Sequence, residues 1–209
     1  MSSMRLYPHT MKTLFFGNVC LVLTACGPKV DLSPNVILET DMGTIEIETY
    51  LEKAPASAGD FLNYVDQGFY NGEGFYRVVH AETDPLNMGM SLIQGGRLDT
   101  ETKSAFITHE PTSETGLRND SAMVSIARNE PGTGSAAYFF INIGNNNFLD
   151  EGGERNPDGA GYATFGKVVK GMNVVKAIQA GEAKGPTEDD IVKGQYLTQP
   201  VIITRAYRK

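Results

Sequence analysis

Cysteine, histidine and clustered positive charge are scarce in this sequence. Its 209 residues include two cysteines and three histidines, and 25 acidic residues outnumber 18 basic ones. The net charge is −7 and no run of basic residues occurs, so the composition argues against a nucleic-acid partner. Hydrophobic residues make up 41% and charged residues 21% of the chain, which is ordinary for a folded globular protein.

Several common catalytic motifs are also missing. The sequence contains no G-x-S-x-G, H-E-x-x-H or P-loop pattern, which argues against the hydrolase classes that carry them. His80 and His109 have no metal-ligating neighbour at a useful spacing. The acidic segment 144–159 does not match a calcium-loop pattern and predicts a solvated loop. No metal or cofactor is therefore expected.

The first 26 residues differ from the rest of the chain. They contain Arg5 and Lys12 but no acidic residue, and residues 13–23 form an apolar run that is too short to span a bilayer. A basic start, a short apolar run and then small residues are typical of a secretory signal peptide, predicted here over residues 1–25. Met11 is an alternative start, because "MK" followed by the apolar run is the more compact signal.

The apolar run ends in "LTAC" at residues 23–26, which resembles the lipobox of bacterial lipoproteins. The resemblance implies cleavage before Cys26 and lipidation of that residue, so that Cys20 leaves with the signal and no disulfide is possible. Gly27 is not the aspartate associated with inner-membrane retention. The resemblance therefore favours a periplasm-facing anchor in the outer membrane of a bacterial cell envelope. An ordinary signal peptide followed by a chance cysteine is the alternative.

The segment 26–35 is rich in proline, glycine and polar residues and predicts a short tether before one domain at 36–209. Helical spacing of apolar residues predicts two helices, within 53–70 and 171–181. Strand-like runs are expected at 35–40, 44–50, 75–79, 91–95, 122–127, 138–143, 162–169 and 201–207. Many strands with two helices and no βαβ alternation indicate an antiparallel sheet or barrel.

The run "FYRVV" at residues 75–79 places a charge among apolar side chains. Because strand side chains alternate between faces, Arg77 is expected to share a face with Phe75 and Val79. Taken alone, this pattern also fits an exposed strand face, or an arginine whose stem lies on the core while its head reaches water.

Six segments in order resemble the cyclophilin-type peptidyl-prolyl isomerases: "FYRVV", "LIQGG", "MVSIAR", "YFFI", "NNFLD" and "YATFGKVVKGMNVV". Their order and spacing match that family from about residue 36 to the end of the chain. The resemblance implies a mainly β fold, an eight-stranded antiparallel closed barrel capped by two α-helices. It also implies catalysis of cis–trans isomerisation at Xaa-Pro bonds.

The resemblance carries particular roles onto this chain. Arg77 matches the arginine that hydrogen-bonds to the prolyl nitrogen, Gln94 the glutamine that orients the substrate carbonyl and supports the arginine, and Phe140 the floor of the proline pocket. The other residues that it implies in substrate binding are Leu92, Ala127, Arg128, Tyr138, Phe148, Leu149 and Tyr162.

The sequence departs from the family pattern at several places. Phe148 stands in place of a tryptophan and Tyr162 in place of a histidine, which implies weak cyclosporin binding. Ser91 replaces an aromatic wall of the proline pocket, and Tyr138 adds bulk beside it. Eleven residues, 80–90, replace a short link. We hypothesise that Met88 or Met90 within this insertion folds back to refill the wall.

These features together predict a monomeric, lipid-anchored isomerase whose clients are unfolded or proline-containing polypeptides. It would accelerate the folding of exported proteins near the membrane. The main alternative is a weakly catalytic or non-catalytic chaperone or adaptor that holds proline-containing peptides in the same groove. A lipocalin-like barrel for a small apolar ligand is a third reading, which no lipocalin motif supports.

Overall fold

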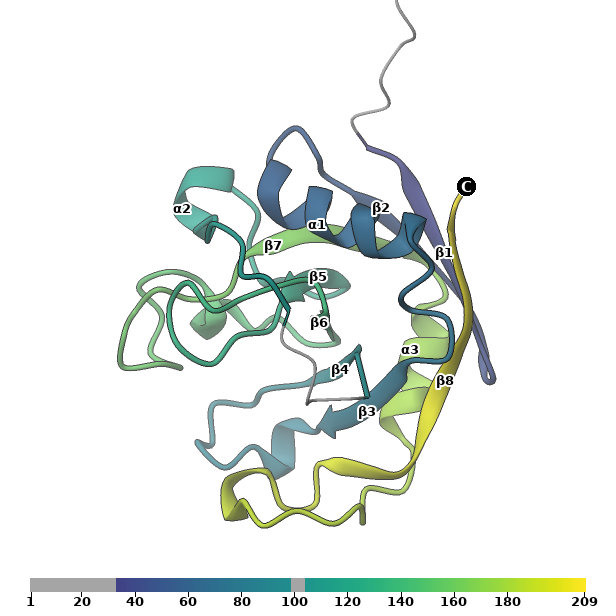
Figure 1. Ribbon diagram of the computed structural model, residues 1–209. Helices are drawn as coiled ribbons and strands as arrows, with labels where there is room; N and C mark the ends of the chain where they lie inside the picture. Colours follow the sequence, from purple (N-terminus) through teal and green to yellow (C-terminus); the bar gives the residue numbers. More distant parts are fainter. Residues whose placement is uncertain (1–32, 99–103) are drawn as a thin grey trace, which may run out of the picture. The chain divides into compact units, whose positions relative to one another are not determined.

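Eight strands close into an antiparallel barrel in the part of the chain that the structure describes, residues 33–98 and 104–209 of a computed structural model (Figure 1). The expected signal peptide, Cys26 and most of the tether lie outside the described residues. Around the barrel, neighbouring strands follow the order β1-β2-β7-β5-β6-β4-β3-β8. The strands are β1 (Asn35–Thr40), β2 (Gly43–Thr49), β3 (Gly74–Val79), β4 (Leu92–Gly96), β5 (Met123–Ile126), β6 (Tyr138–Asn142), β7 (Thr164–Lys170) and β8 (Tyr196–Arg208).

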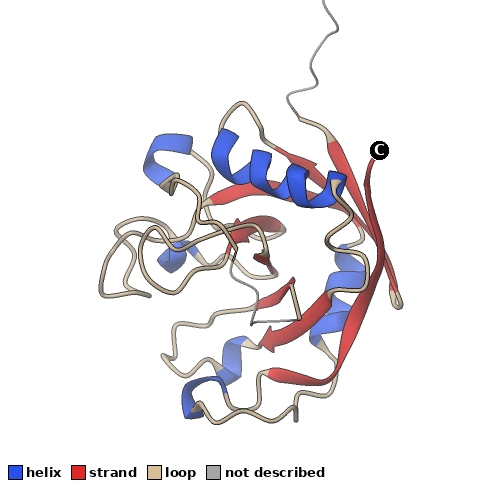
Figure 2. Cartoon of the chain, in the orientation of Figure 1, coloured by secondary structure: helices blue, strands red, loops and turns tan. Residues whose placement is uncertain are grey.

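Helices are few and most are short (Figure 2). The two α-helices expected from the sequence are α1 (Pro55–Asp66), which packs on β7 and β8, and α3 (Met172–Gln179), which packs on β2, β3 and β4. The remaining elements are α2 (Thr112–Thr115) and the 3₁₀ turns η1 (Ala81–Thr83), η2 (Asn147–Leu149) and η3 (Asp190–Val192). None of the helices in the described ranges is long and apolar enough to cross a membrane.

The closed eight-stranded barrel confirms the expected fold class, with two local differences. The last strand begins at Tyr196 instead of 201, and the four-residue helix α2 was not expected. Pro200 obscures the start of β8 in the sequence because proline cannot donate to a strand ladder. The structure accommodates it at a register shift in the pairing of β8 with β3, between Tyr196 and Val201.

Phe61 of α1 anchors the main hydrophobic core inside the barrel. Its ring centroid lies 5.0 Å from that of Phe165 on β7 and 5.6 Å from that of Phe139 on β6. Phe139 in turn meets Phe75 of β3 edge to face, with centroids 5.8 Å apart. Side chains that belong to this core therefore mark the inner face of each strand.

Alternation along the strands divides neighbouring residues between the two faces of the barrel wall. On β6, Phe139 lies in the main core, whereas Phe140 belongs to a second, smaller apolar cluster. On β4, Ile93 lies in the main core and Leu92 joins that second cluster. The alternation thus directs one member of each apolar pair outward, where a ligand can reach.

A β-bulge in β3 places Arg77 and Phe75 on opposite faces of the barrel wall. The pairing of β3 with both of its neighbours shifts between Phe75 and Arg77, so that Tyr76 is an extra residue in the ladder. Phe75 and Val78 consequently both lie in the main core, while Val79 lies in the outer cluster. The prediction that Arg77 shares a face with Phe75 was wrong, because strict alternation does not hold across a bulge.

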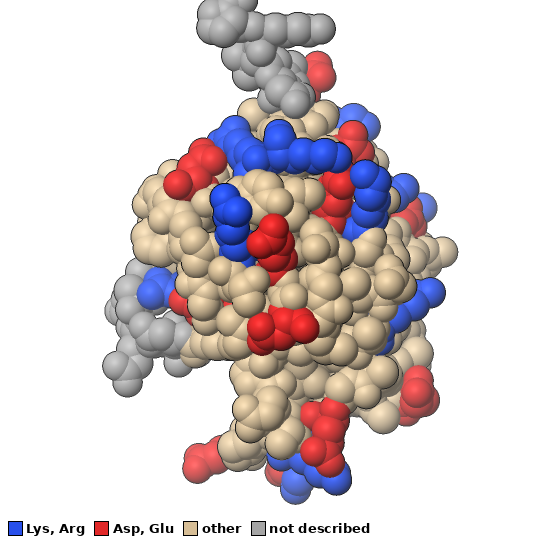
Figure 3. Space-filling model, turned by 90° about the vertical axis from the view of Figure 1, so that its right-hand side faces the viewer, with Lys and Arg blue, Asp and Glu red and all other residues tan. Residues whose placement is uncertain are grey.

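Glu46 ties together three parts of the barrel seam. Its carboxylate accepts hydrogen bonds from Asn35 on β1 (2.5 Å), Lys170 on β7 (3.0 Å) and the C-terminal Lys209 (2.9 Å). These contacts, that of Lys209 first, lower the pKa of Glu46 to about 2. Basic and acidic side chains are interspersed on the face that carries β1 and β8 (Figure 3).

Glu46→Gln is expected to reduce the change in the free energy of unfolding between pH 7 and pH 2. Because the folded pKa lies below the ordinary value of 4.5, the ionised carboxylate stabilises the fold above that value, and this contribution is lost as the pH falls towards about 2. The variant should be less stable than the wild type at pH 7, and the gap should close towards pH 2 in urea unfolding. Glu52→Gln, at an exposed position, is the control; a constant gap would contradict this prediction.

Candidate active site

Arg77, Gln94 and Phe140 form one row across three adjacent strands. In the strand register Arg77 of β3 lies opposite Gln94 of β4, and Gln94 lies opposite Phe140 of β6. Side chains directly opposite each other in antiparallel strands are about 4.5–5.5 Å apart at Cβ. The fold therefore brings together residues that are up to 63 positions apart in the sequence.

Two glutamines hold the Arg77 guanidinium. Nη1 donates to Oε1 of Gln94 (2.8 Å), while Nε and Nη2 both donate to Oε1 of Gln195 (2.9 and 2.6 Å). Gln94 is oriented in turn by its Nε2, which donates to the hydroxyl of Tyr76 (2.9 Å). Burial lowers the pKa of Arg77 below its ordinary value. The expected support of Arg77 by Gln94 is present.

Gln195 and Tyr76 were not identified from the sequence. Gln195 precedes β8, is 2% exposed and lies outside the six motifs. Tyr76 stands beside Arg77 in "FYRVV", and its ring stacks on Tyr196 with centroids 6.2 Å apart. Its position at the bulge could not be read from alternation, and no local signal links Gln195 to a residue 118 positions earlier.

An apolar floor lies beside this charged row. The five buried residues of the outer cluster expose 0–4% of their surface: Val79, Met90, Leu92, Phe140 and Leu149. Ala127, Phe148 and Tyr162 are partly buried and pack against it. The Tyr162 ring meets Phe140 edge to face, with centroids 5.4 Å apart. The expected floor and most of the expected walls are thus assembled next to Arg77 and Gln94.

Comparison with known proteins agrees with this geometry. The family model for cyclophilin type peptidyl-prolyl cis-trans isomerases matches residues 35–206, which include β1 to β7 in full and all of β8 except its last two residues. The chain belongs to this family. It is a cyclophilin-type peptidyl-prolyl cis-trans isomerase.

Bacterial cyclophilins are among its relatives. The chain is 39% identical to peptidyl-prolyl cis-trans isomerase A of Dickeya dadantii over 193 residues, which cover 89% of this chain and 91% of the relative. It is 34% identical to peptidyl-prolyl cis-trans isomerase B of Escherichia coli, covering 81% of this chain and 99% of the relative. The fold matches a Cryptosporidium parvum cyclophilin-type isomerase with a TM-score of 0.63 at 20% identity, covering 85% and 98% of the two chains.

The insertion at 80–90 completes the apolar floor of this cyclophilin. Met90 is 4% exposed and belongs to the same cluster as Phe140, whereas Met88 is only half-buried. The hypothesis that a methionine from the insertion refills the wall is confirmed for Met90.

Asp84 organises the insertion from within. Its side chain is fully buried and accepts hydrogen bonds from the main-chain N–H groups of Met88 (3.0 Å) and Met90 (3.1 Å). Arg155, from the loop before β7, donates to Asp84 at 2.6 Å. Burial raises the pKa of the Asp84 carboxyl, but Arg155 and the main-chain donors outweigh it, so the pKa lies below its ordinary value. A buried ion pair therefore holds Met90 in place.

Ser91 has a connecting role. Its hydroxyl accepts a hydrogen bond from Nε2 of Gln179 on α3 (2.9 Å), and the same Gln179 nitrogen donates to the carbonyl of Val79 (2.6 Å). Its main chain exchanges hydrogen bonds with the side chain of Asn146. Ser91 thus fastens the start of β4 to α3, while its neighbour Met90 contributes to the floor.

Three expected binding residues lie outside the apolar cluster or are engaged in the fold. The Arg128 side chain forms an ion pair with Asp158 (2.9 Å), and its guanidinium lies 5.1 Å from the centroid of Tyr162. The Ala127 N–H donates to the carbonyl of Tyr138 (2.9 Å). Tyr138 is half-buried at the start of β6, opposite Gly96. The main-chain N–H of Ala127 is therefore already paired within the fold.

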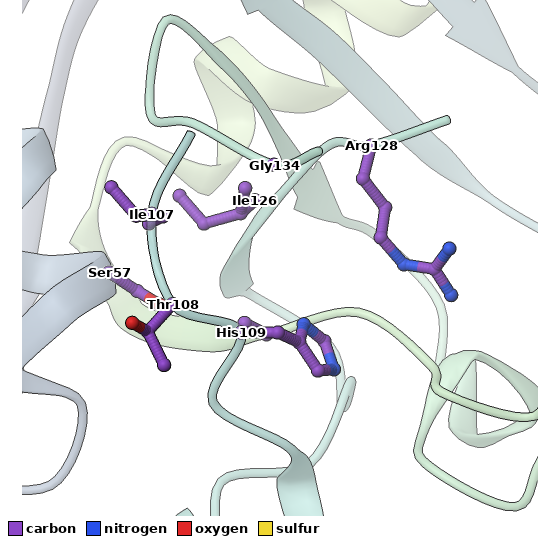
Figure 4. Close-up of a pocket in the computed structure, with 8 residues that line it drawn as sticks. Ser57, Ile107, Thr108, His109, Ile126, Arg128 and Gly134 are labelled. Atoms are coloured by element: carbon purple, nitrogen blue, oxygen red, sulfur yellow. The ribbon is translucent and has the colours of Figure 1, made fainter. Parts of the chain in front are cut away.

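A small cavity beside Arg128 is lined by none of the five buried residues of the outer cluster (Figure 4). With a volume of about 10 Å³ it has room for about one water molecule, which is too little for a proline ring. His109 beside it is bonded through Nε2 to the carbonyl of Ala160 (2.9 Å). The residues that line the cavity are Ser57, Ile107, Thr108, His109, Ile126, Arg128, Gly134 and Ala163. Within the described ranges, no three His, Cys, Asp or Glu side chains are grouped to hold a metal ion.

Proposed function

We propose that this isomerase accelerates Xaa-Pro rotation through a hydrogen bond from Arg77 to the prolyl nitrogen, while the proline ring rests on Phe140. The observation that supports this mechanism is the row of Arg77, Gln94 and Phe140 beside the apolar floor. Leu92 and Leu149 belong to that floor, and Phe148 and Tyr162 are the partly exposed residues at its rim. Ala127, Arg128 and Tyr138 are proposed to meet the residues that precede proline.

The chemistry requires no nucleophile, metal or net proton transfer. Amide resonance opposes rotation with a barrier of about 18–20 kcal/mol, and the nitrogen lone pair is released from conjugation only in the twisted state. A fixed cationic donor at the nitrogen stabilises that twisted state more than the planar one, which is the condition for catalysis. Arg77 has this character because its position is held by two amides and it is half-buried.

An isomerisation assay on short Xaa-Pro peptides tests the proposal. The wild-type protein should accelerate exchange that otherwise takes tens of seconds at 25 °C. Binding of the same peptides is measured in parallel by titration calorimetry. Binding without acceleration would contradict the catalytic proposal and favour the alternative of a chaperone or adaptor that holds proline-containing peptides.

We further propose that the protein acts on unfolded, exported polypeptides from a lipid anchor at Cys26, in the periplasm and with the outer membrane favoured. The sequence supports this through the apolar run 13–23 and the "LTAC" segment. The absence of tryptophan at Phe148 supports weak cyclosporin binding, and we propose a monomer.

Cys26→Ser is expected to release the protein from membranes. The substitution removes the thiol that would carry the lipid, so the processed protein should move from the membrane fraction to the soluble fraction on cell fractionation. Cys20→Ser, within the expected signal peptide, is the matched control and should leave partitioning unchanged. A Cys26→Ser protein that still partitions with membranes would rule out this anchor.

A further inference from the structure

Gln195 is held in place by hydrogen bonds of both its side chain and its main chain. Its Oε1 accepts two hydrogen bonds from the guanidinium, and its Nε2 donates to the carbonyl of Ile191 in η3 (3.4 Å). Its main-chain carbonyl accepts from the N–H of Val78 (2.8 Å), and its own N–H donates to the carbonyl of Val192 (3.1 Å). With 2% of its surface exposed, Gln195 has little freedom to turn away from Arg77.

The partners of Arg77 differ from those of the other arginines that form ion pairs. Arg118, Arg128, Arg155 and Arg208 each pair with a carboxylate. Arg77 is held by the neutral amides of Gln94 and Gln195, and none of the ion pairs among the described residues includes it. Its positive charge is therefore fixed in position without being compensated.

The distinction matters for the reaction. A guanidinium has five N–H donors, and the two glutamines use three, which leaves two for a substrate. A carboxylate in place of either amide would accept the same hydrogen bonds, but it would also stabilise the charge before the amide twists. The guanidinium would then interact less strongly with the prolyl nitrogen in the twisted state. The extra stabilisation of the twisted amide over the planar one, on which the rate depends, would become smaller.

We infer that Gln195 is a positioning residue for catalysis, which fixes the Arg77 guanidinium from the side opposite Gln94 while leaving its charge uncompensated. The inference rests on the proposed role of Arg77. After burial, the titratable groups with the largest effect on the pKa of the guanidinium are Tyr196, Tyr76, Arg155 and Tyr162, and none of these four is a carboxylate.

Gln195→Glu tests the inference with nearly the same shape and the same hydrogen-bond acceptor. We expect kcat for a short Xaa-Pro peptide to fall at least ~10-fold at pH 7, a modest loss beside the roughly 10²–10³ that follows removal of a preorganised donor elsewhere. Peptide Kd should stay within about twofold. Thermal stability should change little, because the variant retains both hydrogen bonds from Arg77 and adds an ion pair, which offsets the loss of the 3.4 Å hydrogen bond from Nε2 to the Ile191 carbonyl. Gln67→Glu adds the same charge at an exposed helix end and is the control.

The outcomes separate this inference from the proposed function. Wild-type kcat in Gln195→Glu, together with a large loss in Arg77→Ala, would overturn the inference and leave the role of Arg77 intact. Wild-type kcat in both variants would overturn the proposed mechanism. A fall in kcat that is matched by an equal fall in Gln67→Glu would show a general charge effect and would also overturn the inference. Gln195→Ala, which removes the acceptor, should lower kcat as well.

Discussion

Arg77→Ala is expected to lower kcat for Xaa-Pro isomerisation at least ~10-fold, or about 1.4 kcal/mol of transition-state stabilisation. The loss should appear in kcat more than in peptide Kd, because the substitution leaves intact the apolar cluster of Phe140, Leu92 and Met90 that is proposed to hold the proline ring. A chymotrypsin-independent assay, such as NMR exchange spectroscopy on a short Ala-Pro peptide, measures both quantities in one sample.

Arg77→Lys sharpens this test. Lysine retains the charge but lacks the planar guanidinium, which donates hydrogen bonds to Gln94 and Gln195 at the same time. Arg77→Lys should therefore recover only part of the lost rate. Arg205→Ala is the matched control, since Arg205 is exposed on β8 and its guanidinium lies 4.5 Å from the Tyr207 ring centroid. Equal kcat values for the wild type and Arg77→Ala would exclude the mechanism.

Asp84→Asn is expected to reduce the free energy of unfolding by about 3 kcal/mol, the lower end of the range for breaking a buried ion pair. The substitution leaves the Arg155 guanidinium, of which 11% is exposed, without its negative partner. It also weakens the acceptor for the Met90 N–H, so the apolar floor should loosen and peptide KM should rise. Urea unfolding and peptide titration measure the two effects separately.

Asp66→Asn provides the comparison at a surface ion pair. Asp66 pairs with Arg208, and both side chains are more than 40% exposed, so the loss there should be about 0–1 kcal/mol. Because the folded pKa of Asp84 is lowered, its stabilising contribution is present above about pH 3.9, the ordinary pKa of an unfolded aspartate, and is lost as the pH falls through the folded value. Equal losses for the two variants at pH 7 would refute a structural role for the buried pair.

Much of the barrel and part of the site could be predicted because they depend on local pattern. Alternating side chains identified the strands, and helical spacing identified α1 and α3. The motifs that contain Arg77, Gln94 and Phe140 then pointed to one row, and the register of β3, β4 and β6 places them there. The strand and helix patterns are local, whereas the site residues could be predicted only because six motifs occur in order, and none of these motifs identifies the site alone.

The parts that could not be predicted depend on contacts between distant segments. Gln195 reaches Arg77 only because β8 pairs with β3, and no property of residues 194–196 indicates that neighbour. Asp84 looked like any polar residue in a loop until the fold brought Arg155 against it. The bulge at Tyr76 arises from pairing with two strands at once, so alternation alone misplaced Phe75.

The position of β8 in the barrel also has a consequence for when the protein can fold during synthesis. β8 is the last strand in the chain, yet it pairs with β1 and β3, and the N–H of Lys209 donates to the carbonyl of Asn35 (2.8 Å). Such high contact order makes folding slow, since distant segments must meet before the ring closes. A nascent chain that has not yet reached residue 195 therefore lacks both the closed barrel and Gln195. Each molecule should acquire activity only after its own C-terminus has emerged, and so cannot assist its own synthesis in cis.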